Sequence, residues 1–313
     1  MGMARPLRVD VANGWYHVTA RGIERRSIFG CAADHERFLS LLGEGVDRHR
    51  LLLHAHVELA NHYHLVVQTP DANLSGAMQW LNLSYATWFN RRHDRVGPLF
   101  QGRFRSIPVQ DSAWAYDLSL YVHLNPIMRK AHGLSRHQKA AEAQGLRSPD
   151  PETVSKRLNE LRRYKWSSYP AYAGYAQAPN WLHTDELLRR ATRKRAERVA
   201  QYRRDVQQCL SKGVAPELKE RLADGFALGT ASFRRKVREG ARGQRECVGT
   251  RELRRRLTFE DAVKVVESLK GEERHAWIGR RGDWGRPLLL WTARRYCGTT
   301  LREIGEMCGN MDY

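Results

Sequence analysis

The chain has 313 residues, of which 53 are Lys or Arg and 34 are Asp or Glu, and its formal net charge is +19. Its 42% hydrophobic and 9% aromatic content argues against wholesale disorder, and at roughly 100–200 residues per domain the length fits two or three domains. No apolar run approaches the roughly 18 residues of a membrane-spanning helix, and the N-terminus lacks the apolar core of a secretory signal. Five scattered cysteines without a CxxC pair exclude a disulfide framework and zinc-finger spacing. We therefore expect a cytoplasmic protein, with a polyanion as the first partner to consider.

The positive charge is concentrated in one segment. Between Arg189 and Arg256 there are 21 Lys and Arg against 8 Asp and Glu, which gives +13 of the total +19. This imbalance favours a DNA- or RNA-holding surface over a merely solvated helix face. The run Arg234, Arg235 and Lys236 supplies candidate phosphate contacts, which carry no sequence information by themselves.

The first half of the pattern predicts three strands and a helix. Residues 15–21 alternate as in a strand, and 51–59 and 62–67 are two further strand candidates. Between the first two, apolar residues at helical spacing predict a helix for which Asp34 is the expected N-cap.

The second half of the pattern adds a helix, a strand and another helix. Residues 74–91 follow the helical period, and 99–109 form a fourth strand candidate in which Pro108 belongs at an end or an edge. Ser112 is the expected cap of a helix that Pro126 should kink or end. The order β-α-β-β-α-β predicts an α+β, ferredoxin-like antiparallel sheet with helices on one face. An additional helix and a basic, all-α C-terminal region follow it.

Four side chains form a candidate chemical site. His62 and His64 are two apart on a strand, so both project to one face, and Tyr121 and Asn125 are four apart on a helix and share a face. A metal held by the imidazoles and the amide oxygen could polarise a phosphoryl group for attack by the tyrosine. Each part alone is weak, since a helical tyrosine is usually packed and His54 and His56 form a second such pair. Ligand chemistry alone leaves zinc open.

Several ordered motifs resemble one family. The stretch ANHYHLVVQTP (60–70) resembles the histidine–hydrophobe–histidine (HUH) metal motif of Y1 tyrosine transposases. The blocks NLSGAMQWLNLSYATWFNRRH, GPLFQGRF, YVHLNP, WSSYPAY and ALGTASF follow as in the IS200-like branch called REP-associated tyrosine transposases. This resemblance covers about residues 10–240. The stretch 293–313 is similar to the helix-turn-helix of the replication initiator DnaA, whose recognition helix would begin after the final Asp. Because the chain ends at Tyr313, we expect that motif to be incomplete.

The resemblance implies a specific chemistry. Such proteins cleave single-stranded DNA beside palindromic hairpins, through a 5′-phosphotyrosine that leaves a free 3′-OH. By motif, Tyr121 is the nucleophile, His62 and His64 are metal ligands, and Asn125 stands where related transposases place a glutamine as third ligand. The implied metal is Mg²⁺ or Mn²⁺, and the protein is a monomer or a homodimer. Tyr63 should face away from the two histidines and is a much weaker candidate nucleophile.

Other functions and roles stay open. Arg25, Arg26, Arg103 and Arg105 flank the predicted sheet and are either phosphate contacts or solvated surface charge. A non-catalytic hairpin-binding protein on the same scaffold is the main alternative. A rolling-circle initiator would share the chemistry, but no helicase or origin-binding module is recognisable. The predicted regions are a catalytic domain (1–132), a connecting segment packing on it (133–184), a basic helical DNA-binding region (185–256) and the DnaA-like helical region (257–313).

Overall fold

The computed structural model describes residues 10–128, 142, 148–212, 227–243, 259–280 and 282–293. The chain divides into two compact units, Met1–Ala241 and Arg242–Tyr313. The stretch 294–313, which holds nearly all of the predicted helix-turn-helix, lies outside the described residues.

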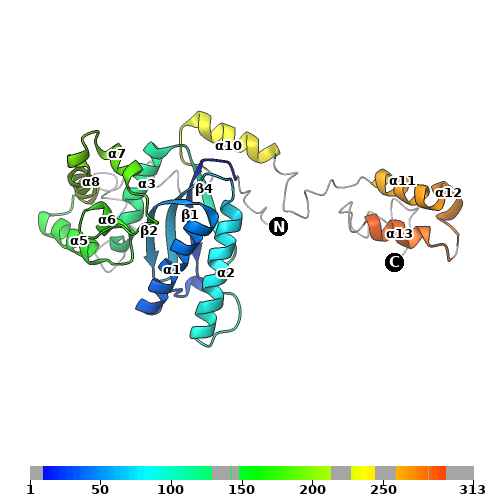
Figure 1. The fold of residues 1–313 in the computed structure, drawn as a ribbon, viewed down its shortest axis with the longest axis horizontal. Coiled ribbons are helices and arrows are strands. Elements are labelled where there is room, and N and C mark those ends of the chain that lie inside the picture. The colour runs from blue at the N-terminus through cyan, green and yellow to red at the C-terminus, as the bar shows by residue number, and fades with distance from the viewer. Residues whose placement is uncertain are drawn as a thin grey trace. The chain divides into compact units, whose positions relative to one another are not determined.

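A four-stranded antiparallel sheet forms the centre of the first unit (Figure 1). Its strands lie in the order β2-β3-β1-β4 and are β1 (Gly14–Arg21), β2 (Leu52–Leu59), β3 (His62–Thr69) and β4 (Arg105–Val109). Helices α1 (Ala32–His49) and α2 (Leu74–Arg92) connect them, and a short 3-10 turn (Ile23–Arg25) follows β1. This is the predicted ferredoxin-like order, and the α+β fold class is confirmed.

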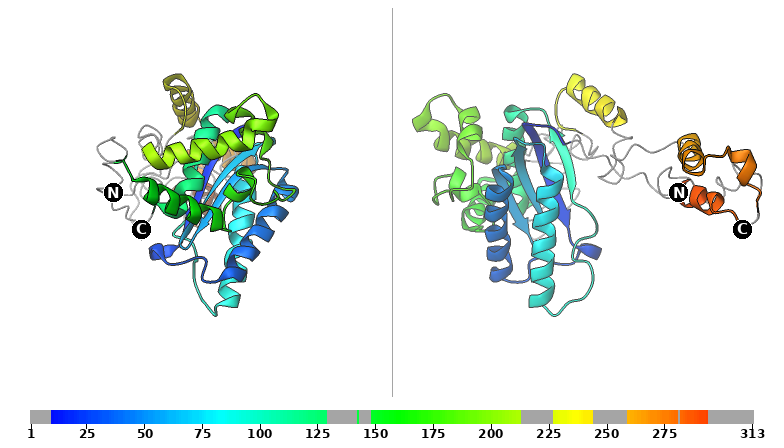
Figure 2. Two further views of the ribbon diagram at one scale, coloured as in Figure 1. Left: turned by 90° about the vertical axis from the view of Figure 1, so that its left-hand side faces the viewer. Right: turned by 45° about the vertical axis from the view of Figure 1, so that its right-hand side comes forward.

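Helices cover both faces of the sheet, which corrects the expectation of a single covered face. On one face α1 and α2 lie side by side (Figure 2) and bury the residues that alternate along β1, namely Tyr16, Val18 and Ala20. On the other face lies α3 (Ser112–Leu124), whose Leu118 and Val122 are fully buried. Coverage of both faces explains why nearly every residue of β2 and β3 is buried.

The helices after α3 cover its outer side. They are α5 (Pro151–Arg163), α6 (Tyr169–Tyr172), α7 (Asp185–Ala191), a 3-10 turn (Arg195–Glu197) and α8 (Arg198–Lys212). Tyr202, Val206 and Leu210 of α8 belong to the same buried cluster as α3. The segment before α6 hydrogen-bonds to the edge strand β2, with Ser168 N donating to His56 O over 3.0 Å. Helix α8 therefore contributes core residues as well as surface charge.

Two predicted helix caps are wrong by one turn or less. Helix α1 begins after Cys31, and Asp34 stands at its third position, where its carboxylate accepts from Gly30 N at 2.7 Å and Cys31 N at 3.1 Å. Helix α3 is capped by Asp111, whose carboxylate accepts from two backbone N–H groups, and Ser112 is its first residue. In α1 the expected Asp34 carboxylate acts from inside the first turn, and in α3 the carboxylate of Asp111 takes the place of the expected serine hydroxyl.

The fourth strand is shorter than predicted. It begins at Arg105 and pairs only with β1, so Pro108 sits on an edge strand, where its missing N–H is tolerated. Its free edge is partly covered by Leu228, which donates to Pro108 O and accepts from Gln110 N. Helix α10 (Ala231–Gly243) begins three residues later. At the end of α3, Pro126 lies in a 3-10 turn (Asn125–Ile127) that ends the helix, as predicted.

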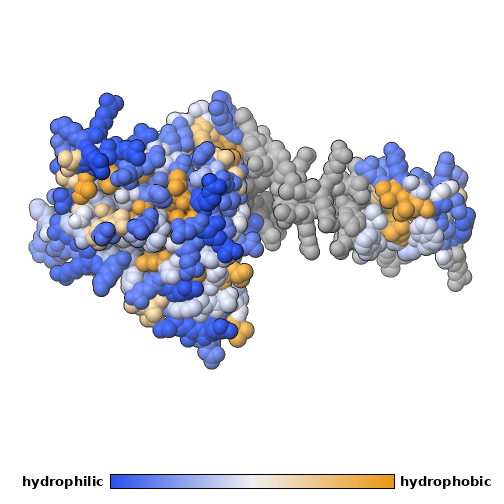
Figure 3. Space-filling view, viewed as in Figure 1, coloured by the Kyte–Doolittle hydropathy of each residue, from blue (hydrophilic) through white to orange (hydrophobic). Residues whose placement is uncertain are grey.

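The second unit contains three short described helices, α11 (Phe259–Lys270), α12 (Arg274–Trp277) and α13 (Gly285–Thr292). They pack around the fully buried Trp277. The surface of this unit shows a hydrophobic patch (Figure 3), and among the exposed apolar side chains of the unit are Val265 and Leu269. Within the described parts of both units, no helix has the length and apolarity that crossing a membrane requires.

Candidate active site

The pairing of β1 with β3 places several polar side chains on the α3 face of the sheet. Thr19 lies opposite His64, and Arg21 lies opposite His62. Because side chains alternate along a strand, Tyr63 points to the other face, where it is fully buried and its hydroxyl donates to Asn82 Oδ1 at 2.7 Å. Tyr63 is thereby separated from the two imidazoles by the sheet itself.

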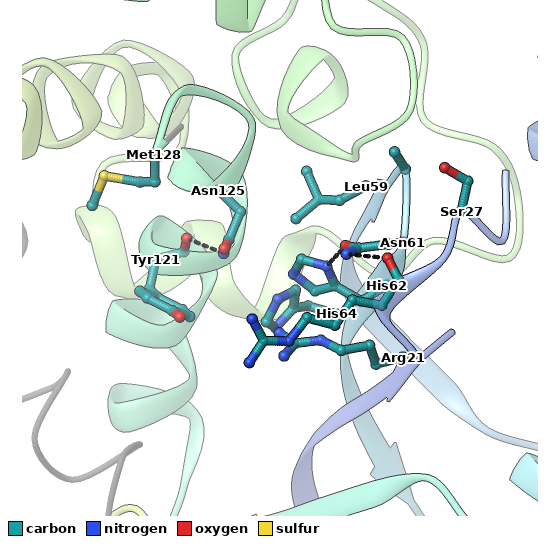
Figure 4. A pocket seen from close by; sticks show the side chains of 11 residues that line it. Arg21, Ser27, Leu59, Asn61, His62, His64, Tyr121, Asn125 and Met128 are labelled. Atoms are coloured by element: carbon teal, nitrogen blue, oxygen red, sulfur yellow. Dashed lines mark hydrogen bonds between the residues drawn. The ribbon is translucent and has the colours of Figure 1, made fainter. Parts of the chain in front are cut away.

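Helix α3 completes the site. Tyr121 and Asn125, one turn apart, line a cavity of about 600 Å³ together with His62, His64 and Arg21 (Figure 4). The four side chains that the sequence singles out for chemistry therefore meet in one place. The Tyr121 ring lies edge-on to the His64 ring, with 6.1 Å between centroids.

A third histidine belongs to this cluster. His17 Nε2 lies 2.8 Å from His64 Nδ1, and the two rings are stacked with 5.1 Å between centroids. His17 is also edge-on to Tyr121, with 6.3 Å between centroids. Sequence reasoning missed His17 because the HxH spacing pointed only within β3. The one local signal for His17 is the alternation along β1, which puts it on the same face of the sheet as Thr19, the residue opposite His64.

The two inner imidazoles are neutral at pH 7. Burial, followed by the charge of Arg105, lowers the pKa of His17 to about 3. Burial also lowers the pKa of His64 well below its usual range, and the neighbouring His17, His62 and Arg21 add to this effect. A neutral imidazole keeps the lone pair that a metal ligand needs.

The hydrogen bonds of the site orient the groups that could bind a cation. His64 Nε2 is buried and has no hydrogen-bond partner among the described residues. His62 Nδ1 lies 2.6 Å from Asn61 Oδ1, so the ring's other nitrogen carries the lone pair when Nδ1 donates. Asn125 Nδ2 donates to Tyr121 O at 2.9 Å, which fixes the amide and leaves Oδ1 as its acceptor.

This donor set fits a divalent cation with an open coordination sphere. The described residues contain no cluster of three or more His, Cys, Asp or Glu side chains that could hold a metal. A cation here would instead have two imidazoles and one amide oxygen, and the other positions would go to water or a substrate oxygen. An open sphere is typical of catalytic rather than structural metal sites.

A second cavity of about 390 Å³ adjoins the first. The two share Arg21, His62, His64 and Tyr121, and the second adds His17, Gln101, Arg103 and Arg105. Neither cavity has an Asp or Glu among its described lining residues. Both cavities are therefore suited to a polyanion.

The predicted DNA-binding residues divide into three groups. Arg25 lines the first cavity, and Arg103 and Arg105 line the second. Arg26 lines neither and forms an exposed ion pair with Glu24 at 2.8 Å. The last group lies on α10, outside both cavity linings. Arg235 and Lys236 are exposed there, and Arg234 is half-buried.

Residues 10–125 match the family model described as Transposase IS200 like. This segment is therefore similar to IS200-like transposases, and it includes His62, His64, Tyr121 and Asn125. A solved structure of a REP-associated tyrosine transposase bound to a REP hairpin is similar to the chain at 14% identity and a TM-score of 0.40, over 56% of this chain and 89% of that one. No curated protein matches the chain.

Proposed function

We propose that the chain cleaves and rejoins single-stranded DNA beside palindromic hairpins through a covalent phosphotyrosine on Tyr121. The observation that carries the proposal is the meeting of Tyr121, Asn125, His62 and His64 in one cavity of a segment similar to IS200-like transposases. The hairpin substrate is taken from the motif resemblance, and the acid-free lining of both cavities supports a nucleic acid as ligand.

In the proposed reaction the Tyr121 oxygen attacks the phosphorus in line with the 3′ oxygen. The bond from Tyr121 to phosphorus forms as the bond to the 3′ oxygen breaks, the phenolic proton passes to solvent, and the 3′ oxygen takes up a proton. The product is a 5′-phosphotyrosine and a free 3′-OH. One phosphodiester replaces another, so a 3′-OH can reverse the step without ATP.

The residues of the chain prepare this step. The neutral imidazole of His64, the imidazole of His62 and the oriented amide of Asn125 would hold Mg²⁺ or Mn²⁺, which when bound supplies a Lewis acid for a nonbridging phosphate oxygen. Burial raises the pKa of Tyr121, and the charge of Arg21 opposes that rise. Helix α3 holds the phenol at the wall of the cavity that contains the imidazoles.

Trapping of the covalent adduct tests the proposal. We expect a labelled single-stranded hairpin with Mn²⁺ to give a DNA–protein adduct that disappears with Tyr121→Phe, with His62→Ala and with chelator. Tyr63→Phe is the matched control, because that phenol is buried on the opposite face of the sheet, and it should still form the adduct. An adduct with Tyr121→Phe would overturn the assignment. Chelator-insensitive hairpin binding without cleavage would indicate a non-catalytic binding protein instead.

A further inference from the structure

Arg21 occupies the point where the two cavities meet. It is the last residue of β1, pairs across the sheet with His62 and is exposed at the sheet surface. It is among the four residues that line both cavities, and it is the only arginine or lysine of those four. Its side chain extends alongside His64 toward the helix that carries Tyr121 (Figure 4).

The part of the chain that the structure describes places no counter-charge beside Arg21. Among the described residues, no carboxylate forms an ion pair with Arg21 and none lines either cavity. By contrast, nearby Arg26 is paired with Glu24. An arginine without a carboxylate partner, beside the neutral imidazole of His64, can bind a phosphate group by donating two parallel hydrogen bonds to its oxygens.

The other arginines of the site are less central. Arg25 lines only the first cavity, and Arg103 and Arg105 line only the second. A DNA strand that places its reacting phosphate against Tyr121 has nucleotides on both sides of that phosphate, and the two cavities provide room on both sides. The reacting phosphate would lie where the two cavities meet, beside Arg21. Arg25, Arg103 and Arg105 would lie beside the phosphates that precede and follow it.

We propose that Arg21 is a catalytic residue whose guanidinium donates hydrogen bonds to a nonbridging oxygen of the phosphodiester that Tyr121 attacks. This inference rests on the proposed function. As the bond from Tyr121 to phosphorus forms and the bond to the 3′ oxygen breaks, negative charge on the nonbridging oxygens is balanced by the fixed positive charge of Arg21. The guanidinium gives up no proton, because arginine stays protonated in proteins. The attraction of Arg21 for the Tyr121 phenolate is consistent with this placement.

Neutralising the phosphate tests the proposal. Single-turnover adduct formation would be measured with a natural hairpin and with one that carries a methylphosphonate, which is uncharged, at the cleaved linkage. With the natural hairpin we expect Arg21→Met to slow the reaction about 10²–10³-fold, as for removal of one preorganised donor. With the methylphosphonate we expect Arg21→Met and the unaltered protein to differ by less than about 3-fold, because the charge that Arg21 serves is gone.

Two further variants complete the experiment. Arg21→Lys keeps the positive charge but lacks the two parallel donors, so its rate with the natural hairpin should lie between those of the unaltered protein and Arg21→Met. If Arg21→Met does not fold, Arg21→Lys provides the same comparison of the two substrates. Arg37→Gln removes an arginine of α1, on the opposite face of the sheet, and should behave as the unaltered protein with both substrates.

The outcomes separate the two proposals. An equal loss of rate on both substrates with Arg21→Met would overturn the role of Arg21 while leaving the phosphotyrosine chemistry in place. Failure of the unaltered protein to form any adduct would overturn the proposed function and the role of Arg21 together. A loss of rate with Arg21→Met on the natural hairpin, without a loss on the methylphosphonate hairpin, supports both the proposed function and the role of Arg21.

Discussion

At the scale of single residues, the contact between His17 and His64 determines how His64 can act as a ligand. For His64 to coordinate through Nε2, its proton must lie on Nδ1, and the acceptor for that proton is His17 Nε2 at 2.8 Å. Partners of this kind orient metal-binding histidines and fix the position of their proton.

We therefore expect His17→Leu to weaken Mn²⁺ binding about 10–100-fold, whereas His17→Gln, whose side chain can still accept, should stay close to the unaltered protein. Isothermal titration calorimetry measures the Mn²⁺ affinity of each protein directly. His54→Gln is the control, because His54 is also buried but contacts His183 O outside both cavities. Equal Mn²⁺ affinities for His17→Leu and the unaltered protein would contradict the assigned contact.

The sequence predicted part of this cluster. The spacing of His62 and His64, and that of Tyr121 and Asn125, was sufficient to place each pair on one face. His17 and Arg21 could not be predicted in the same way, because they reach the site through the β1–β3 register. Register depends on the whole sheet and is not contained in the spacing within one strand.

At the scale of elements, a buried polar network fixes α3 to its neighbours. His123, two residues after Tyr121, contacts Tyr202 OH of α8 through Nδ1 at 2.7 Å and Ser168 Oγ through Nε2 at 2.6 Å. Ser168 in turn accepts from His56 N of β2, and Tyr202 also contacts Ser119 of α3. The network thereby links the helix that carries Tyr121 to the sheet and to α8.

Removal of the Tyr202 hydroxyl should leave two buried groups of α3 short of a partner. We expect Tyr202→Phe to lower the free energy of unfolding by about 1–3 kcal/mol, measured by urea denaturation. Tyr175→Phe is the comparison, because Tyr175 is 40% exposed and its hydroxyl contacts only Arg162 among the side chains described, and it should change stability by less than about 0.5 kcal/mol. Equal effects of the two substitutions would show that the network does not hold α3.

The elements themselves were largely predictable. Hydrophobic periodicity gave the β-α-β-β-α-β order, and Pro126 marked the end of α3. The second layer of helices was not predictable, because it depends on residues such as Tyr202 meeting α3 across some 80 positions of sequence. The caps were missed because Asp34 acts from inside the first turn and Asp111 precedes the serine that was expected to cap α3.

At the scale of the whole molecule, buried histidines outside the site should make stability depend on pH. Burial lowers the pKa of His54 to about 4 and that of His56 to about 3, and it lowers the pKa of His123 well below its usual range. Below the ordinary histidine pKa of about 6.5 these histidines bind protons in the unfolded chain but stay unprotonated in the folded chain. Burial raises the pKa of Glu58, so Glu58 changes stability with pH in the opposite direction, but it contributes only one proton.

The free energy of unfolding should consequently fall as the pH drops from 7.5 to 5.5, by up to about 1.4 kcal/mol per pH unit for each such histidine. Urea denaturation at several pH values measures the slope, and a replacement of His56 by Leu should make it shallower. A free energy of unfolding that stays constant or rises over this range would contradict the burial of neutral imidazoles.

The most direct test of the whole account is the identity of the residue that becomes linked to DNA. Trypsin should release residues 106–129 as one peptide, which contains both Tyr116 and Tyr121. Tyr116 donates to Asp205 and lies outside both cavity linings, whereas Tyr121 lines both. Tandem mass spectrometry of the trapped adduct should place the 5′-phosphonucleotide on Tyr121. Its presence on Tyr116, Tyr63 or any other residue would contradict the account.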